Sequence, residues 1–191
     1  MSLSPAFFTL PADDVARGLL GATLLVDGVG GVIVETESYD TADPASHSHK
    51  GRTSRNASMF GPVGTAYVYR SYGIHWCINF VCGTEPGGAV LVRALQPTHG
   101  CDVMKVRRGL DTERLLCAGP GRLTQALGLT IAHDGLPLDA PPFQLLAGEP
   151  PHGILVGPRI GITRNAEAPR RFGIAGSRWL SRGFGIPRIV M

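Results

Sequence analysis

The stretch Thr65–Cys82, TAYVYRSYGIHWCINFVC, decides the fold because it contains two strand patterns joined by a turn. TAYVYRSY and HWCINFVC are rich in aromatic and β-branched residues, and the segment SYGIH between them is typical of a turn. A third run, Gly88–Leu95 (GAVLVRAL), follows after the turn sequence GTEPGG. The three runs predict an antiparallel meander.

A second hairpin is predicted nearer the N-terminus. TLLV (residues 23–26) and GVIVETESY (31–39) are strand patterns separated by the turn-rich DGVGG. Residues 40–64 then combine Ser, Gly, Pro, Asp and Asn, which predicts a long surface loop. Long ordered loops of compact domains often carry function.

Helical patterns flank these strands. LPADDVARGLLGA (10–22) predicts a short helix that stops at Gly21, and CDVMKVRRG (101–109) predicts another. In GPGRLTQALGL (119–129), Pro120 suits a first helical position and Gly128 suits the end. From Leu136 to Met191 we expect strands and loops. The fold class expected is α/β (α+β): a single mixed domain over residues 1–191 with a curved, largely antiparallel β-sheet and surrounding helices.

Charge is distributed unevenly along the chain. The 191 residues are 43% hydrophobic and 17% charged, which is enough apolar material for one core. Residues 1–49 hold seven acids and one base, whereas residues 151–191 hold seven arginines and one acid. The arginines either form a basic face suited to phosphates or are solvated at the surface.

Several classes of protein are not supported by the sequence. The four cysteines contain no CxxC pair, and no secretory signal or membrane-length apolar run occurs. We therefore expect a reduced cytoplasmic protein, associated with the nucleoid if bacterial, without structural zinc. No nucleotide-binding glycine motif and no GxSxG motif is present, so we expect no cofactor. Lys50 and Lys105 are the only lysines, which leaves few candidates for a Schiff-base nucleophile.

The VETESY stretch places two carboxylates on one predicted strand. Alternate side chains share a face, so Ile33, Glu35, Glu37 and Tyr39 are expected together, opposite Val32, Val34 and Thr36. This face is either solvated or carries a catalytic carboxylate, whose burial would raise its pKa. A third hypothesis adds His47 and His49 to Glu35 or Glu37 as metal ligands, although an HxH pair is a weak signal.

Tyr72 stands apart from the other aromatic residues of the meander. Tyr67 and Tyr69 share one face of a strand, where aromatic side chains usually pack in a core or in cross-strand pairs. Tyr72 precedes Gly73 at the expected hairpin tip. A ring on a turn is poorly placed to enter its own core and well placed to wedge into a partner.

Taken in order, the segments VETESY, ASHS, RNASMF, GTAYVYRSYGIHWCINF, VLVRALQP and CAGPGRLTQALG resemble the alkyladenine DNA glycosylase family, also called 3-methyladenine or methylpurine DNA glycosylase. PRIGITRNAEAPRRFGIAGSRWLS resembles the family's closing segment more loosely. The resemblance implies a DNA glycosylase domain whose β-hairpin protrudes from the DNA-binding face. Such an enzyme flips alkylated or deaminated purines out of duplex DNA, namely 3-methyladenine, 7-methylguanine, hypoxanthine and ethenoadenine. It hydrolyses the N-glycosidic bond and leaves an abasic site, without a lyase step.

The resemblance also implies roles for individual residues. Glu37 matches the catalytic glutamate, and Arg93 matches the arginine that helps it hold the attacking water. The residues that sandwich and hydrogen-bond the flipped base correspond to Tyr39, His47 and Tyr69. Asn79 matches the amide that crowds the amino group of normal guanine, and Tyr72 matches the side chain that enters the duplex.

The expected partner is double-stranded DNA containing damaged purines, bound by a monomer, with no membrane and no metal. The candidates for phosphate contacts are Arg52, Arg55, Arg164, Arg170, Arg171, Arg178 and Arg182. Two alternatives stay open. One is a DNA-damage-binding protein that uses the wedge and pocket without hydrolysis, and the other is a metal-dependent hydrolase built on His47, His49 and Glu37.

Overall fold

The computed structural model describes residues 2–185 and 188–190. These residues form one mixed α/β domain around a nine-stranded sheet that is not closed. The strands are β1 (Thr23–Val26), β2 (Val29–Tyr39), β3 (Ala66–Ser71), β4 (His75–Cys82), β5 (Gly88–His99), β6 (Phe143–Leu146), β7 (Ile154–Gly157), β8 (Arg171–Ile174) and β9 (Arg188–Val190). The helices are α1 (Ala12–Gly18), α2 (Cys101–Arg108), α3 (Glu113–Leu116) and α4 (Pro120–Leu127), with 3-10 turns η1 (Pro5–Thr9), η2 (Ala57–Phe60) and η3 (Ile131–His133).

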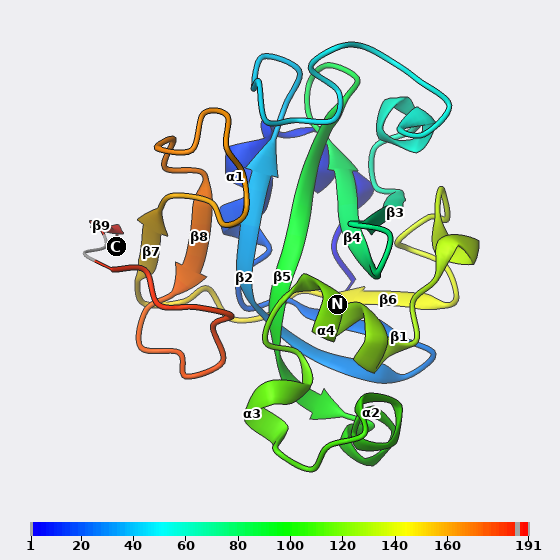
Figure 1. The fold of residues 1–191 in the computed structure, drawn as a ribbon, viewed down its shortest axis with the longest axis vertical. Coiled ribbons are helices and arrows are strands. Elements are labelled where there is room, and N and C mark those ends of the chain that lie inside the picture. Colours follow the sequence, from blue (N-terminus) through cyan, green and yellow to red (C-terminus); the bar gives the residue numbers. More distant parts are fainter. Residues whose placement is uncertain (1, 186–187, 191) are drawn as a thin grey trace.

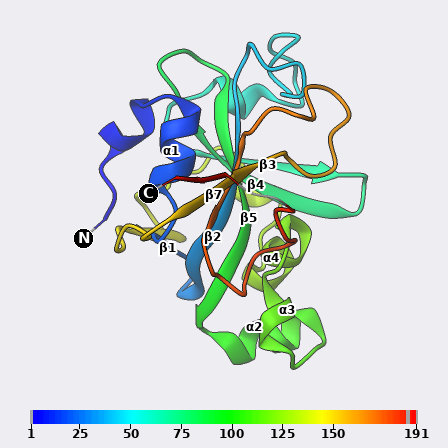
Figure 2. The ribbon, with the colours of Figure 1, turned by 90° about the vertical axis from the view of Figure 1, so that its left-hand side faces the viewer.

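The sheet confirms the expected fold class. Its order is β3-β4-β5-β2-β8-β7-β9, with β1 pairing to β2 and β6, and the strand pairs are antiparallel. The β3-β4-β5 meander and the β1-β2 hairpin are both present, as predicted. Figure 1 shows β2, β5 and β4 side by side in the middle of the molecule, with β7 and β8 at one edge. Figure 2 shows the β3-β4 hairpin projecting away from α1 and the N-terminus.

The turn between β1 and β2 is shorter than expected. Asp27 and Gly28 have φ values of 49° and 76° and form a two-residue turn, so the prediction of a DGVGG turn is wrong. Gly30 and Gly31 lie inside β2 instead. A Cβ atom on Gly30 would lie 1.9 Å from the Leu24 carbonyl oxygen. Glycine is therefore required here for close strand pairing.

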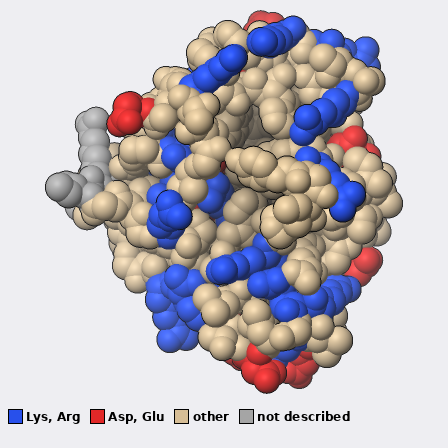
Figure 3. All heavy atoms as spheres, viewed as in Figure 1, with Lys and Arg blue, Asp and Glu red and all other residues tan. Residues whose placement is uncertain are grey.

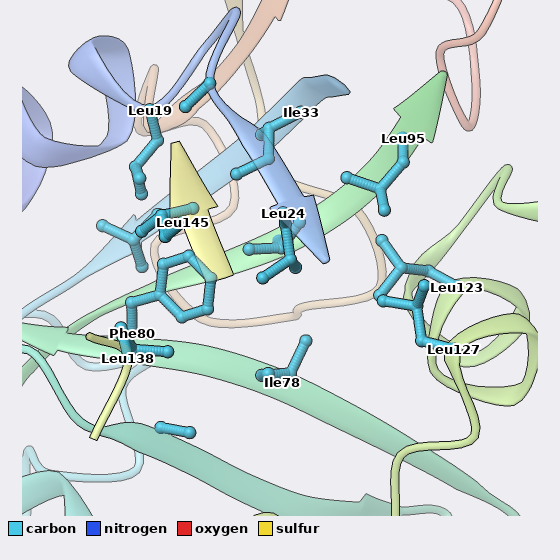
Figure 4. Packing of buried hydrophobic residues seen from close by; sticks show 14 of the residues in the cluster. Leu19, Leu24, Ile33, Ile78, Phe80, Leu95, Leu123, Leu127, Leu138 and Leu145 are labelled. Carbon is cyan, nitrogen blue, oxygen red and sulfur yellow. The ribbon is translucent and has the colours of Figure 1, made fainter. Parts of the chain in front are cut away.

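Alternation along β3, β4 and the first part of β5 separates a core face from a second face. Val68, Phe80 and Val92 belong to the main core, whereas their neighbours point to the other side. Helices α1 and α4 cover the core face, and Figure 4 shows Leu19, Leu123 and Leu127 packing toward the strand residues Leu24, Ile78 and Leu95. The second face carries Tyr67, Asn79 and Arg93, all of which are buried.

A bulge in β2 changes which side chains share a face. Ile33 pairs with Leu95 but Glu35 pairs with Ala94, so one extra residue is inserted in β2. Ile33 therefore packs in the main core, and the prediction that it lies with Glu35 and Glu37 is wrong. The two glutamates do share a face, as expected, because both contact Arg93.

Helices α2 and α4 lie where the sequence predicts them, whereas α1 ends at Gly18, so the prediction that it stops at Gly21 is wrong. Helix α4 begins at Pro120 and ends before Gly128, whose φ is 74°, and α2 covers Cys101–Arg108. The short α3 was not predicted. From Leu136 onward the chain forms strands β6 to β9 and loops, as expected; Ile186, Pro187 and Met191 lie outside the described residues. None of the helices in the described part is long and apolar enough to cross a membrane.

Candidate active site

A cavity of about 310 Å³ opens beside the β3-β4 hairpin. Its walls come from the 40–64 loop, from β3 and β4, and from the segment that joins β7 to β8. The lining residues are Tyr39, Ala45, His47, Arg55, Met59, Tyr67, Tyr69, Ser71, Tyr72, Asn79, Gly161 and Ile162. Strands distant in the sequence thus build one aromatic pocket, of a size that suits a small flat ligand.

The structure brings the predicted base-pocket residues together in this cavity. The rings of Tyr67 and Tyr69 are stacked with centroids 5.4 Å apart, and the His47 ring lies 4.5 Å from that of Tyr69. His47 Nδ1 lies 2.9 Å from the Tyr67 hydroxyl, and the Asn79 side-chain amide donates to the Tyr67 carbonyl oxygen at 3.1 Å. Tyr39 completes the wall.

His47 keeps a lowered pKa in this position. Desolvation is the main cause, and the positive charge of the nearby Arg55 adds to it, so the pKa falls below the ordinary value of 6.5. At neutral pH the imidazole is therefore uncharged. A neutral ring at the cavity mouth does not repel a cationic ligand.

Tyr72 lies at the tip of the hairpin. Its side chain is 83% exposed, and its φ of 50° together with 69° at Gly73 forms a tight turn closed by the hydrogen bond from Ile74 N to Ser71 O. The turn holds the Tyr72 ring away from the body of the protein, at the rim of the cavity.

Glu37 is completely buried directly behind the cavity wall. Its Oε2 accepts a hydrogen bond from the Tyr39 hydroxyl at 2.8 Å, and its Oε1 accepts from the backbone N–H of Ile160 at 2.9 Å. Arg93 Nη1 lies 3.1 Å from the same Oε1. Neither Glu37 nor Arg93 is among the lining residues, and the Tyr39 hydroxyl connects Glu37 to the cavity wall. Oε2 has one partner and can accept a second hydrogen bond.

Glu35 is the second carboxylate that binds Arg93, and it also binds Arg171. It accepts from Arg93 Nε at 3.1 Å, from Arg171 Nε at 2.7 Å and from the Ser181 hydroxyl at 2.8 Å. Since Glu35 and Glu37 are 0% exposed, the interpretation of a solvated sheet face is wrong. Burial alone would lower the pKa of Arg93, but Glu37 and Glu35 raise it above its ordinary value.

The acid-rich first part of the chain and the arginine-rich last part pair with each other. Arg159 forms a buried ion pair with Asp43, Arg171 pairs with Glu35, and Arg170 Nη2 lies 2.7 Å from Asp40. These three arginines therefore neither form a basic face for phosphates nor lie solvated at the surface, so both interpretations are wrong for them. Sequence reasoning missed Arg159 and Asp43, although the opposite charges of the two segments were a signal for such pairing.

The predicted phosphate-binding arginines fall into two groups. Arg171 is 3% exposed and also donates to the carbonyl oxygens of Arg182 and Gly183, so its expected position on the surface is wrong. Arg170 is partly buried among Asp13, Asp40 and Asp43, which neutralise its charge. The arginines that remain exposed are Arg52, Arg55, Arg164, Arg178 and Arg182. Figure 3 views the face from which the hairpin projects and shows Lys and Arg side chains spread over the upper and lower parts of this face.

The residues proposed as metal ligands have other partners. His47 contacts Tyr67, as described above, and His49 Nδ1 lies 3.0 Å from the Thr41 carbonyl oxygen. Over residues 2–185 and 188–190, no three His, Cys, Asp or Glu side chains gather in a way that could hold a metal ion.

Comparisons with known proteins agree with these features. A sequence model of the family described as methylpurine-DNA glycosylase (MPG) matches residues 6–178. A candidate 3-methyladenine DNA glycosylase of Rhodopseudomonas palustris (strain HaA2) is 62% identical over 93% of this chain and 89% of its own. One from Nitrosospira multiformis is 57% identical over 100% of this chain and 99% of its own. With this match over most of its length, the chain belongs to the methylpurine-DNA glycosylase family.

Proposed function

We propose that this DNA glycosylase flips alkylated or deaminated purines out of duplex DNA and hydrolyses the N-glycosidic bond with a water activated by Glu37. The observation that carries this proposal is the buried carboxylate of Glu37, hydrogen-bonded at 2.8 Å to a tyrosine of an aromatic cavity. The candidate substrates are 3-methyladenine, 7-methylguanine, hypoxanthine and ethenoadenine.

The cavity and the hairpin tip together suit base flipping. A base inside the stack cannot be attacked, and extruding its nucleotide costs a few kcal/mol, least where the base is damaged or mismatched. Tyr72, exposed on a tight turn, is suited to fill the space that the base leaves. Stacking against the rings of Tyr39, His47 and Tyr69 would return roughly 1 to 3 kcal/mol per base.

Selection of damaged purines follows from charge and shape. Alkylation at N3 or N7 makes a purine cationic, and the faces of tyrosine rings attract cations. His47 is uncharged at neutral pH because its pKa is lowered, so it adds no repulsion. Asn79, held at the cavity wall by Tyr67, would crowd the exocyclic amino group of normal guanine.

The reaction requires a positioned water and a stabilised sugar cation. Glu37 accepts the proton of the water while the water oxygen bonds to C1′ and the C1′–N bond breaks, with its electron pair leaving on the base. A general base contributes about 10²- to 10⁴-fold, and the carboxylate charge favours the oxocarbenium-like transition state. Arg93 would hold the water together with Glu37. Cationic purines leave without further protonation.

A purely hydrolytic, monofunctional reaction is proposed because, among residues 2–185 and 188–190, no lysine lines the cavity. Lys50 lines a neighbouring cavity, and Lys105 on α2 lies 3.6 Å from Asp102 and Glu113. The product would be an abasic site in an uncut strand.

The protein is proposed to act as a monomer on double-stranded DNA, whose phosphates contact Arg52, Arg55, Arg164, Arg178 and Arg182. The test is incubation with methylated duplex DNA, followed by chromatography of the released bases and electrophoresis of the strand before and after alkali. Free methylpurine together with a strand that breaks only in alkali supports the proposal. A borohydride-trapped protein-DNA adduct would contradict the monofunctional mechanism.

A further inference from the structure

We propose that Arg159, held by Asp43, is a specificity-determining residue that reduces the preference of the base pocket for cationic over neutral purines by placing a positive charge behind the Tyr39 ring. This inference rests on the function proposed above. It concerns residues to which neither the sequence nor the family comparison assigns a role.

The position of Arg159 relative to Tyr39 is the first observation. The guanidinium carbon lies 4.6 Å from the centroid of the Tyr39 ring. Tyr39 lines the cavity but Arg159 does not, and its side chain is 0% exposed. The cation therefore covers the ring face that points away from the cavity, and the opposite face remains available to a flipped base.

The second observation is how firmly this cation is held. Both terminal nitrogens of Arg159 contact the carboxylate of Asp43, whose side chain is also 0% exposed, and Nη1 donates to the Ser38 carbonyl oxygen at 3.0 Å. The Asn165 side chain donates to the same carboxylate at 3.0 Å. A buried bidentate pair with this many partners is rigid, so the charge stays over the ring.

The third observation is the chain neighbour of Arg159. The backbone N–H of Ile160 donates to Glu37, and Gly161 and Ile162 line the cavity. The segment that begins at Arg159 thus contacts Glu37, the proposed general base of the reaction, and also forms part of the pocket wall. Asp43 is two residues from Ala45, another lining residue, so the ion pair joins two walls of the cavity.

The physical consequence concerns the charge of the bound base. A tyrosine ring attracts a cation because its face is electron-rich. The pair of Arg159 with Asp43 is neutral overall, but its guanidinium is the group that lies over the ring, 4.6 Å from the centroid. This nearby positive group draws the electron density of the ring toward itself and repels a second cation on the other face. A neutral purine, which stacks mainly through dispersion and apolar contact, is affected less. Arg159 therefore brings the stacking of neutral hypoxanthine closer to that of cationic 7-methylguanine.

The test uses the double variant Arg159→Gln/Asp43→Asn, because removing one partner alone would leave the other charge buried and unpaired. The control is Arg17→Gln, which removes an arginine 4.4 Å over the ring of Phe172, and neither residue lines the cavity. The readout is the ratio of single-turnover rates for 7-methylguanine and hypoxanthine in otherwise identical duplexes. Differences in leaving-group reactivity cancel when each variant is compared with the wild type.

We expect the ratio to rise about three-fold or more in the double variant and to stay unchanged in Arg17→Gln. An unchanged or lower ratio in a folded double variant would overturn the inference. Wild-type protein that releases neither base would instead overturn the proposed function.

A second measurement is independent of the folding of the double variant. Tyr39→Leu removes the ring through which the charge acts. The lost hydrogen bond to Glu37 slows the release of both lesions and cancels in the ratio of their rates. If Arg159 reduces the cation preference of the ring, the loss for 7-methylguanine should exceed the loss for hypoxanthine by less than about three-fold, and a larger excess would overturn the inference.

Discussion

The Nη1 atom of Arg93 lies 3.1 Å from Oε1 of Glu37, in a position that is closed to solvent. Arg93 does not belong to Glu37 alone, because its Nε lies 3.1 Å from Glu35, which also binds Arg171. Two carboxylates and two guanidinium groups therefore balance each other inside the protein. Removing any one of them leaves an uncompensated buried charge.

Glu35→Gln is predicted to destabilise the fold. It leaves Arg93 and Arg171 with Glu37 as the remaining counter-charge, so the free energy of unfolding should fall by about 3 kcal/mol or more. Urea denaturation at pH 7 measures this loss. Glu113→Gln is the control, because its exposed pair with Lys105 at 3.6 Å is screened by solvent and should contribute little to stability. Equal stability of the two variants would contradict the balanced network.

Tyr72→Ala is predicted to impair base release from duplex DNA while leaving stability unchanged. The side chain is 83% exposed, so it contributes little to the core, but no ring would fill the space left by the flipped base. The decisive comparison is release of hypoxanthine from duplex and from single-stranded DNA. Only the duplex reaction should slow, by roughly ten-fold or more if the ring supplies stacking of 1 to 3 kcal/mol. Val106→Ala, equally exposed on α2, should change neither rate.

Exposed and buried arginines are predicted to differ in their effect on salt dependence. Replacing Arg52, Arg164, Arg178 or Arg182 with Ala should reduce the slope of log affinity against log salt by about one unit for each lost phosphate contact. Arg171→Ala should instead lower stability, because its partner Glu35 is fully buried. Titrations of lesion-containing duplex at several salt concentrations measure the slopes. Identical slopes for the wild type and the exposed variants would refute the phosphate contacts.

The pH dependence should differ between cationic and neutral lesions. Because the pKa of His47 is lowered by burial and by Arg55, the ring gains its charge only below the ordinary value of 6.5. As the pH falls below that value, a charged His47 would repel 7-methylguanine but not hypoxanthine. The rate ratio of the two lesions should therefore fall with pH in the wild type. In His47→Gln, which carries no charge at any pH, the ratio should stay constant, and a parallel fall there would assign the effect to another group.

The meander and the first hairpin could be predicted from sequence because alternation and turn residues are local signals. The bulge in β2 could not, since one inserted residue between Ile33 and Glu35 depends on pairing with β5. The burial of Arg171 was also beyond local patterns, because it depends on β8 pairing with β2 and on the approach of Glu35.

The site was predictable in part. The resemblance placed Tyr39, His47, Tyr69 and Asn79 together, and the structure gathers them in one cavity. The wall contributed by Gly161 and Ile162 comes from a loop without a pattern of its own. Its position is fixed by the ion pair of Arg159 with Asp43, which joins residues 116 positions apart. Contacts at such sequence separation leave no periodic signal.

The most direct test compares the wild type with Glu37→Gln in excess EDTA, on methylated duplex DNA and on an oligonucleotide with one hypoxanthine. Single-turnover base release and lesion affinity are measured on the same preparations. The wild type should release the damaged base, and Glu37→Gln should bind the lesion but release it about 10²- to 10⁴-fold more slowly. Undiminished release of the damaged purine by Glu37→Gln would contradict the role of Glu37 as the general base that activates the water. Tight lesion binding without release by the wild type would mean that the pocket recognises damage without excising it.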